Sequence, residues 1–219
     1  MNMDWAVIPA NLPFLMKGLW VSFQLAIFVI VISFPLACVI AVGRVSSRWW
    51  IRFPSATFVN AMRSNPLILI VFWFFFLVPL IIGRPVGDFA SVMIAFVVFF
   101  SAYFTEIIRS GIQSVDRNQI QAGLSTGLTY FQVMRMVVLP QAMRNMMPAL
   151  VTECIIIFQG TTIAYVVGLR EFLNSTFLVT ERTIRPVELY LFAALVYFVV
   201  CFAGSCLARY LEKKKVRTQ

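Results

Sequence analysis

The chain has 219 residues, of which 61% are hydrophobic and 12% are charged. Soluble domains carry roughly 25% charged residues, about twice this fraction. With 22 Phe and a mean hydropathy of +0.88, the chain has more apolar surface than a soluble fold of this length can bury. The composition excludes a disordered chain, a disulfide-rich secreted domain and an ordinary soluble enzyme, and it predicts a polytopic membrane protein.

Several residue types that common chemistry requires are missing. The sequence has no His, which excludes His-based catalysis and most zinc or haem sites, so we expect no metal site. The four Cys lie in apolar runs and form no CxxC pair, as expected for small core residues. None of the four Lys follows a Gly-rich stretch, so the chain has no phosphate-binding P-loop with which to bind ATP.

Five uncharged or nearly uncharged runs are long enough to cross a bilayer, which takes roughly 20 residues in a helix. They predict membrane-spanning helices at about 18–43, 60–83, 89–108, 145–168 and 189–208. The predicted organisation is a periplasmic N-terminal segment at 1–17, a transmembrane domain at 18–210 and a basic cytoplasmic tail at 211–219.

The orientation follows from the distribution of basic residues. Of the 18 Lys and Arg, 13 fall in the segments 44–63, 109–144 and 209–219, which all lie on one side of the predicted bundle. Because cytoplasmic connections are enriched in Lys and Arg, we expect the N-terminus outside and the C-terminus inside. The net charge of +9 reflects this asymmetry and does not indicate nucleic-acid binding. The basic tail suits a contact with anionic membrane lipid or a simple cytoplasmic stop signal.

The segment between the third and fourth spans, at about 110–142, is long for a membrane bundle. It predicts two short helices, at Asn118–Gly127 and at Tyr130–Leu139, with Pro140 ending the second. The apolar face of the second helix is predicted to consist of Phe131, Met134 and Val138. Two such helices would form a docking surface for a partner; the alternative is that they lie on the lipid surface.

This loop resembles the EAA loop of bacterial ABC importer permeases, which runs Glu-Ala-Ala, three residues, Gly, nine residues, an aliphatic residue, one residue and Leu-Pro. The matching positions are Gln121, Ala122, Gly123, Gly127, Val137, Leu139 and Pro140. The sequence departs from the pattern twice, because Gln121 stands for Glu and Gly123 for the second Ala. The spacing is kept throughout.

The resemblance covers nearly the whole chain. Residues 102–115 are similar to the segment before the loop in polar amino-acid permeases, and 63–67 resemble the family's Arg-x-x-Pro-Leu. Residues 159–163 stand where that family usually has Lys-Asp-Thr-Ser-Leu. Features of the glutamate/aspartate branch in particular are Asp4-Trp5, Glu181-Arg182 and Val187-Glu188.

The resemblance implies an all-α integral membrane protein with the transmembrane fold of a type 1 ABC importer, in which the EAA loop couples to an ATPase. It implies a permease subunit in the bacterial inner membrane, importing an amino acid, most simply glutamate or aspartate. The implied partners are a pair of ATP-binding subunits that hold ATP and Mg, a second homologous permease forming a heterodimer, and a periplasmic solute-binding protein. The chain itself would be no enzyme and bind no cofactor.

Three other functions stay open on the sequence alone. The chain could serve another polar amino acid, such as glutamine or a basic one. It could be a secondary transporter, although no internal repeat is evident. It could be an integral membrane enzyme, although the nine acidic residues are scattered and form no catalytic cluster. ATPase activity that appears only with an ATP-binding partner would separate the importer from the last two.

Polar residues within the spans are candidates for the substrate pathway, because ionisable groups are costly in a membrane. Glu153 lies in the fourth span and could bind an ammonium group, or it could hold two spans together through a buried hydrogen bond or ion pair. Gln159, Thr161 and Thr162 follow in the same span. They could bind a zwitterion beside a turn unwound at Gly160, or they could bond back to helix carbonyls.

Glu106 and Arg109 lie three residues apart at the cytoplasmic end of the third span. This spacing places both side chains on one helix face. It predicts either a local ion pair or a gate.

Overall fold

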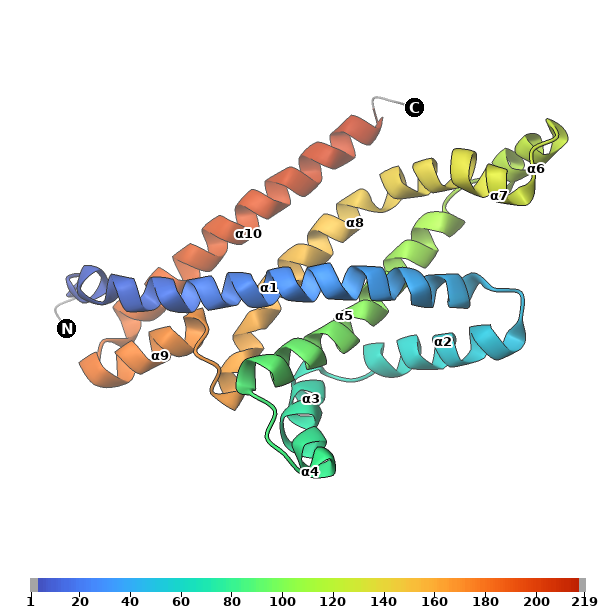
Figure 1. Cartoon of the computed structure of the whole chain (residues 1–219). Helices are drawn as coiled ribbons and strands as arrows, with labels where there is room; N and C mark the ends of the chain where they lie inside the picture. The colour runs from blue at the N-terminus through green and yellow to red at the C-terminus, as the bar shows by residue number, and fades with distance from the viewer. Residues whose placement is uncertain (1–3, 217–219) are drawn as a thin grey trace.

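The computed structural model describes residues 4–216, and this range is helical with no strand. Long helices cross one another to form an open bundle, and the short helices α6 and α7 project from one end of it (Figure 1). Four helices are long and apolar enough to cross a membrane, and a bent helix pair provides a fifth candidate span. The all-α membrane architecture expected from the sequence is therefore confirmed.

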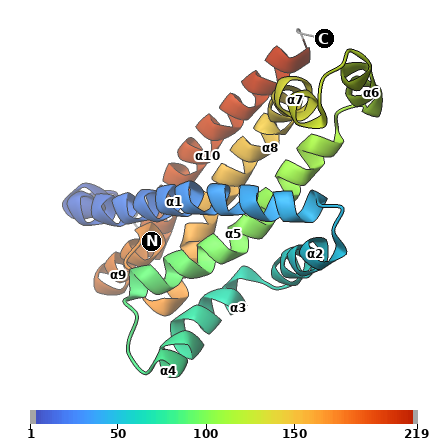
Figure 2. The same ribbon diagram turned by 45° about the vertical axis from the view of Figure 1, so that its right-hand side comes forward.

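Helix α1 (Val7–Val45) crosses in front of α5 (Asp88–Gln113) and α8 (Leu139–Gly160), and it packs on both (Figure 2). It begins at Val7, well before the expected start at residue 18. Its buried face is rich in small residues at helical spacing: Gly18, Ser22, Ala26, Ser33, Ala37 and Ala41. Small side chains let helix backbones approach closely in a membrane. Accordingly, the Thr105 hydroxyl of α5 reaches the Ala37 carbonyl of α1 at 3.3 Å.

The second predicted span is not one continuous helix, because it is interrupted between Arg63 and Leu67. Residues 60–63, expected within that span, belong to α2 (Trp49–Arg63), which packs along α1. After a bend of 104° the chain continues through α3 (Leu67–Phe72), a π-helical segment (Trp73–Leu77) and α4 (Val78–Ile82). Pro66 explains the break, because proline lacks an N–H and disfavours helical backbone at the residue before it.

The sequence predicted that Pro140 ends the second short helix of the loop, and this prediction was wrong. Helix α7 (Tyr130–Val133) runs through a π-helical segment (Met134–Val138) directly into α8. A π-helical segment also directly precedes the helix that contains Pro79. Proline lacks the N–H for one helical hydrogen bond, and its ring crowds the carbonyl four residues before it. A π-turn changes which carbonyls accept the helical hydrogen bonds, and so it relieves both problems. Both prolines are thus accommodated inside continuous helices.

The core lies around α5, which packs against α1, α2 and α8. Phe96, Phe100 and Phe104 recur along one face of α5 and are fully buried. Past α8, a 3₁₀ segment (Thr161–Val167) ends at Gly168 in the left-handed conformation (φ 79°). Helix α9 (Phe172–Thr183) follows and was not expected from the sequence; α10 (Pro186–Val216) completes the bundle.

Candidate functional site

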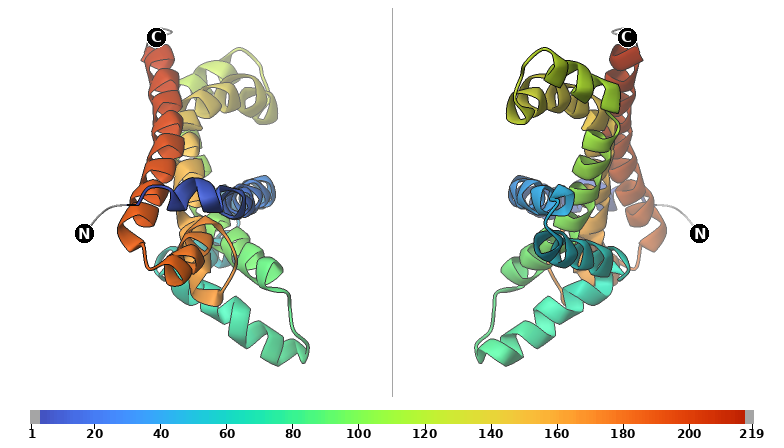
Figure 3. Two further views of the ribbon diagram at one scale, coloured as in Figure 1. Left: turned by 90° about the vertical axis from the view of Figure 1, so that its left-hand side faces the viewer. Right: turned by 90° about the vertical axis from the view of Figure 1, so that its right-hand side faces the viewer.

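The motif-bearing loop folds into a helical hairpin, α6 (Arg117–Ser125) and α7, which stands clear of the long helices in both views of Figure 3. Asp116 caps α6 by accepting from the Asn118 N–H at 2.9 Å. Gly127 turns the chain with a φ of 84°, and Thr129 and Gln132 form a capping box at the start of α7. These caps satisfy the free backbone groups at both sides of the turn.

The hairpin is held closed by contact between its two arms. An added Cβ on Gly123 would lie 2.9 Å from Val133 Cγ2, so the absence of a side chain at 123 permits this approach. Val133, just before the π-helical segment, and Val138, its last residue, are almost fully buried and five residues apart. The predicted apolar face was therefore partly wrong, because Phe131 is 72% exposed and Val133 takes its place inside. The π-turn causes this change, since it alters which residues share a face.

The hairpin and the helix that continues from it leave a set of apolar side chains uncovered: Leu124, Tyr130, Phe131, Met136 and Leu139. Of the remaining motif residues, Gln121, Ala122 and Pro140 are exposed and Val137 is half-buried. An exposed apolar group of this kind on a projecting element is typical of a surface that binds another protein or a membrane, so both interpretations of the loop stay open.

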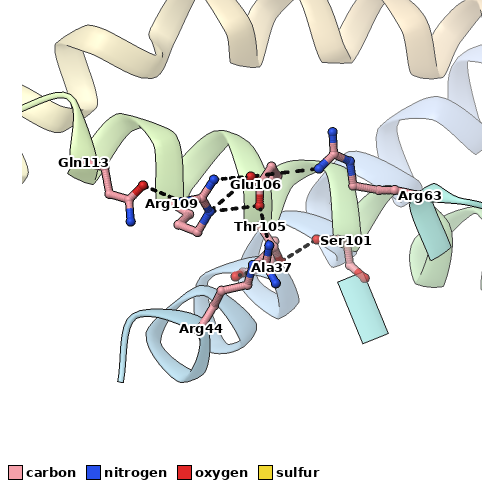
Figure 4. A network of polar contacts seen from close by, with 8 residues as sticks. All are labelled: Ala37, Arg44, Arg63, Ser101, Thr105, Glu106, Arg109 and Gln113. Atoms are coloured by element: carbon pink, nitrogen blue, oxygen red, sulfur yellow. Dashed lines mark hydrogen bonds and ion pairs between the residues drawn. The ribbon is translucent and has the colours of Figure 1, made fainter. Parts of the chain in front are cut away.

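At the same end of α5, Glu106 is the centre of a charged cluster drawn from three helices (Figure 4). Arg109 binds it through Nε at 3.1 and 3.0 Å and also through Nη2. Arg44 at the end of α1 donates to it at 3.2 Å, and Arg63 at the end of α2 lies 3.9 Å away. The structure thus contains the Glu106–Arg109 ion pair, and it adds two arginines that helical spacing did not predict.

A cavity of about 360 Å³ lies beside this cluster, between α5, α8 and the end of α2. Its polar lining includes Arg63, Tyr103, Glu106, Ser110 and Asn145. The Arg63 guanidinium sits over the Tyr103 ring at 5.5 Å from the centroid, which orients it toward the cavity rim. The volume falls in the range of small-molecule sites, roughly 300–1,000 Å³.

Glu153 is buried in α8, four residues beyond Ala149 of the cavity wall. Its Oε1 has no hydrogen-bond partner among the described residues, and Arg63 is the nearby charge that acts on it. The expected hydrogen bond or ion pair that would hold two spans together is therefore absent from the described residues. A buried acid without a partner is costly, and ionisable groups inside a membrane commonly have a function.

The polar group further along the same helix behaves differently. Thr161 is fully buried and donates to the Phe158 carbonyl, and Thr162 donates to the Gln159 carbonyl, both at 2.8 Å. Gly160 stays helical (φ −61°), so the unwound turn proposed for it does not form. The hydroxyls bond back to their own helix, which was the alternative interpretation. The Gln159 side chain is exposed.

Glu171, which lies between the fourth and fifth predicted spans, was not predicted as a site residue. Its carboxylate is fully buried and accepts from the Leu173 and Asn174 N–H groups at 2.8 and 2.7 Å, which caps α9. Ser22 of α1 and Tyr197 of α10 also donate to it, at 3.3 and 3.4 Å. Burial raises the pKa of this carboxyl to about 7, although these donors lower it. Glu171 therefore joins α1, α9 and α10 at the end opposite the hairpin.

One signal could have revealed this site. An acidic residue near the start of a helix is favoured by the helix dipole, so Glu171 just before the polar-apolar stretch 172–183 was such a signal, although Glu is not among the usual N-cap residues. No group of three His, Cys, Asp or Glu within the described part of the chain is arranged to hold a metal ion.

The described residues thus form a membrane protein with up to five spans and a projecting helical hairpin, and comparison with known proteins assigns its class. Residues 33–217 match the family described as "Binding-protein-dependent transport system inner membrane component", and the chain belongs to this family of ABC transporter permeases.

Similar proteins narrow the class to amino-acid transport. The chain is 37% identical over 218 residues to the glutamate/aspartate import permease protein GltK of Escherichia coli O6:H1, covering 96% of this chain and 97% of GltK. It is 34% identical to the probable glutamine ABC transporter permease protein GlnP of Bacillus subtilis, over 94% and 95% of the two chains. A crystal structure of an amino acid ABC transporter with histidines superposes with a TM-score of 0.92 at 28% identity, over 98% of this chain and all of that one. The protein is an amino-acid ABC permease subunit, and it has the transmembrane fold of the type 1 importers.

Proposed function

We propose that this chain forms half of the translocation path of an ATP-driven importer for glutamate and aspartate, in a bacterial inner membrane. The observation that carries the substrate assignment is the identity of 37% to GltK over almost the full length of both chains. The cavity supports it as well: Arg63 is in its lining, 3.9 Å from Glu106, and its guanidinium offers a contact for a carboxylate of an acidic solute.

The α6–α7 hairpin is proposed as the contact with the ATPase. Its exposed apolar side chains, among them Phe131 and Met136, offer a surface for a protein partner, and its capped, closely packed turn can transmit a displacement to α8 as a rigid unit. In this proposal a pair of partner subunits binds ATP and Mg, and the present chain binds neither. Energy from ATP then moves the bundle between outward-facing and inward-facing states.

The proposed assembly also contains a second, homologous permease and a periplasmic solute-binding protein. The N-terminus and α9 then face the periplasm, and the hairpin and the basic C-terminal tail face the cytoplasm, where the tail can contact anionic lipid. The proposed pathway passes Glu153 and the cavity beside Arg63, with the Glu106–Arg109 pair at its inner end.

The test is reconstitution of the chain with its permease, ATPase and binding-protein partners in proteoliposomes. We expect ATP-dependent uptake of glutamate and aspartate, and ATPase activity stimulated by the loaded binding protein. Uptake of glutamine or arginine in preference to both acidic amino acids would contradict the substrate assignment and leave the permease function intact. Uptake that needs no ATPase subunit would contradict the coupling.

A further inference from the structure

A second pocket, separate from the cavity beside Arg63, opens where α1 ends and α2 begins. It has a volume of about 550 Å³ and is walled by the connection 45–48, the first turns of α2 and the end of α5. The side chains that matter here are Arg44, Ser46, Trp49, Arg52, Phe53 and Arg109. Under the proposed orientation this pocket lies at the cytoplasmic surface of the membrane.

The pocket is strongly basic. Three guanidinium groups line it, and no acidic residue is among its described lining residues. Glu106 behind the wall is bound by Arg44 and Arg109, so one negative charge faces three positive ones. Arg52 forms no ion pair or side-chain hydrogen bond with any described residue. Arg44 Nε also lacks an acceptor among them, but this atom is buried. Donor capacity for an anion therefore remains, with the Ser46 and Ser47 hydroxyls beside it.

The rim of the same pocket is aromatic. Trp49 and Phe53 line it and stack at 5.3 Å between centroids, and their side chains are 66% and 56% exposed. Trp at a helix end beside basic residues is typical of the headgroup level of a bilayer. A small soluble anion needs only the basic part of this site, whereas a phospholipid presents an anionic phosphate and apolar chains together.

We propose that this pocket binds the headgroup of an anionic phospholipid, with the phosphate between Arg44, Arg52 and Arg109 and the apolar part of the lipid along the Trp49–Phe53 side of α2. Basic pockets between helices at the cytoplasmic surface are suited to anionic headgroups. The occupied site would tie the connection between α1 and α2 to α5, beside the Glu106 cluster.

The test uses the delipidated full-length chain in its transporter complex, titrated in detergent with phosphatidylglycerol or with phosphatidylcholine of the same acyl chains. We expect phosphatidylglycerol to raise the melting temperature saturably and phosphatidylcholine to have little effect. Arg52→Gln is the informative variant, because Arg52 takes no part in the Glu106 cluster. Losing one basic contact should raise the phosphatidylglycerol concentration at half-saturation about fivefold. Arg52→Lys keeps the charge and should restore most of the affinity.

The matched control is Arg48→Gln, which removes an exposed charge from the same connection but does not line the pocket. If it weakens phosphatidylglycerol binding as much as Arg52→Gln, the effect comes from the general surface charge, and the pocket proposal is overturned. Inorganic phosphate is a further arm: equal stabilisation by phosphate at matched concentration would assign the site to a free anion. Equal stabilisation by phosphatidylcholine would overturn headgroup recognition.

Discussion

Gly123 and Val133 face each other across the α6–α7 hairpin at a distance that leaves no room for a Cβ on Gly123, which would lie 2.9 and 3.2 Å from the two methyl carbons of Val133. Val133 is fully buried, so it has little space into which to move. The two arms of the proposed coupling element are thus fitted closely to one another at this pair of residues.

Gly123→Ala should therefore force the arms apart, at a cost of about 1–3 kcal/mol for overpacking. We expect normal membrane insertion, a lower yield of complex with the ATPase and reduced transport. Val133→Ala removes both methyl groups that the new Cβ would meet, so the double variant Gly123→Ala/Val133→Ala should recover part of the loss. Co-purification with the ATPase subunit measures both effects, and a double variant no better than Gly123→Ala would exclude this contact as the cause.

Gly127 tests the turn itself. Its φ of 84° lies in the left-handed region, and nothing lies within 4 Å of an added Cβ, so a substitution there meets strain and no clash. Gly127→Val should cost about 1–2 kcal/mol and uncouple the permease from its ATPase. Gly127→Asn is the control, because Asn tolerates this conformation. Transport by both variants at the wild-type rate, with equal expression, would show that the turn is dispensable.

Glu153 lacks a partner for its buried Oε1 among the described residues, so neutralising it should not lower stability. We expect the Glu153→Gln complex to assemble normally, with an unchanged or higher melting temperature. Gln has nearly the same shape as Glu but carries no charge that must be desolvated. Reconstituted uptake should fall if the carboxylate serves the pathway. The exposed Glu181→Gln is the control for loss of one acid. A Glu153→Gln complex that falls apart, with normal uptake by the remainder, would assign a structural role to this acid.

Glu171 predicts a pH dependence of stability. Its pKa is raised by burial from 4.5 to about 7, so the folded state holds its proton more tightly than the unfolded state. Its stabilising contribution to the free energy of unfolding is then complete below about pH 4.5, is lost as the pH rises to about 7, and stays lost at higher pH. The melting temperature of the wild-type protein should fall as the pH rises through this range, and that of Glu171→Gln should not. A decline of equal size in the variant would mean that another group titrates.

The orientation of the bundle can be tested by cysteine labelling. The exposed positions Asn118 in α6 and Glu181 in α9 lie at opposite ends of the bundle. In a background where the exposed Cys206 is replaced by Ser, Cys at 181 should react with an impermeant maleimide on spheroplasts, and Cys at 118 only after permeabilisation. The reverse pattern would invert the topology that the 13 basic residues predict.

Interactions between residues close together in the chain determine much of this protein. The membrane class follows from composition, because the transfer energy of long apolar runs adds up along the chain and needs no tertiary contact. The hairpin turn follows from Gly127 and from the Thr129-x-x-Gln132 capping box, whose interactions span only a few residues. The Glu106–Arg109 pair follows from helical spacing for the same reason.

The remaining features depend on residues far apart in the chain, and only the tertiary structure decided them. Ser22 and Tyr197 meet Glu171 because α1, α9 and α10 converge, so an acid between two predicted spans is fully buried. Arg44 and Arg63 reach Glu106 because the bend at 64–66 and the close packing of α1 on α5 bring three helix ends together. Val133 takes the inside position expected for Phe131 because the π-turn beside Pro140 rotates the face of the helix. Such contacts arise from packing between elements, and the periodicity of a single segment contains no information about its neighbours.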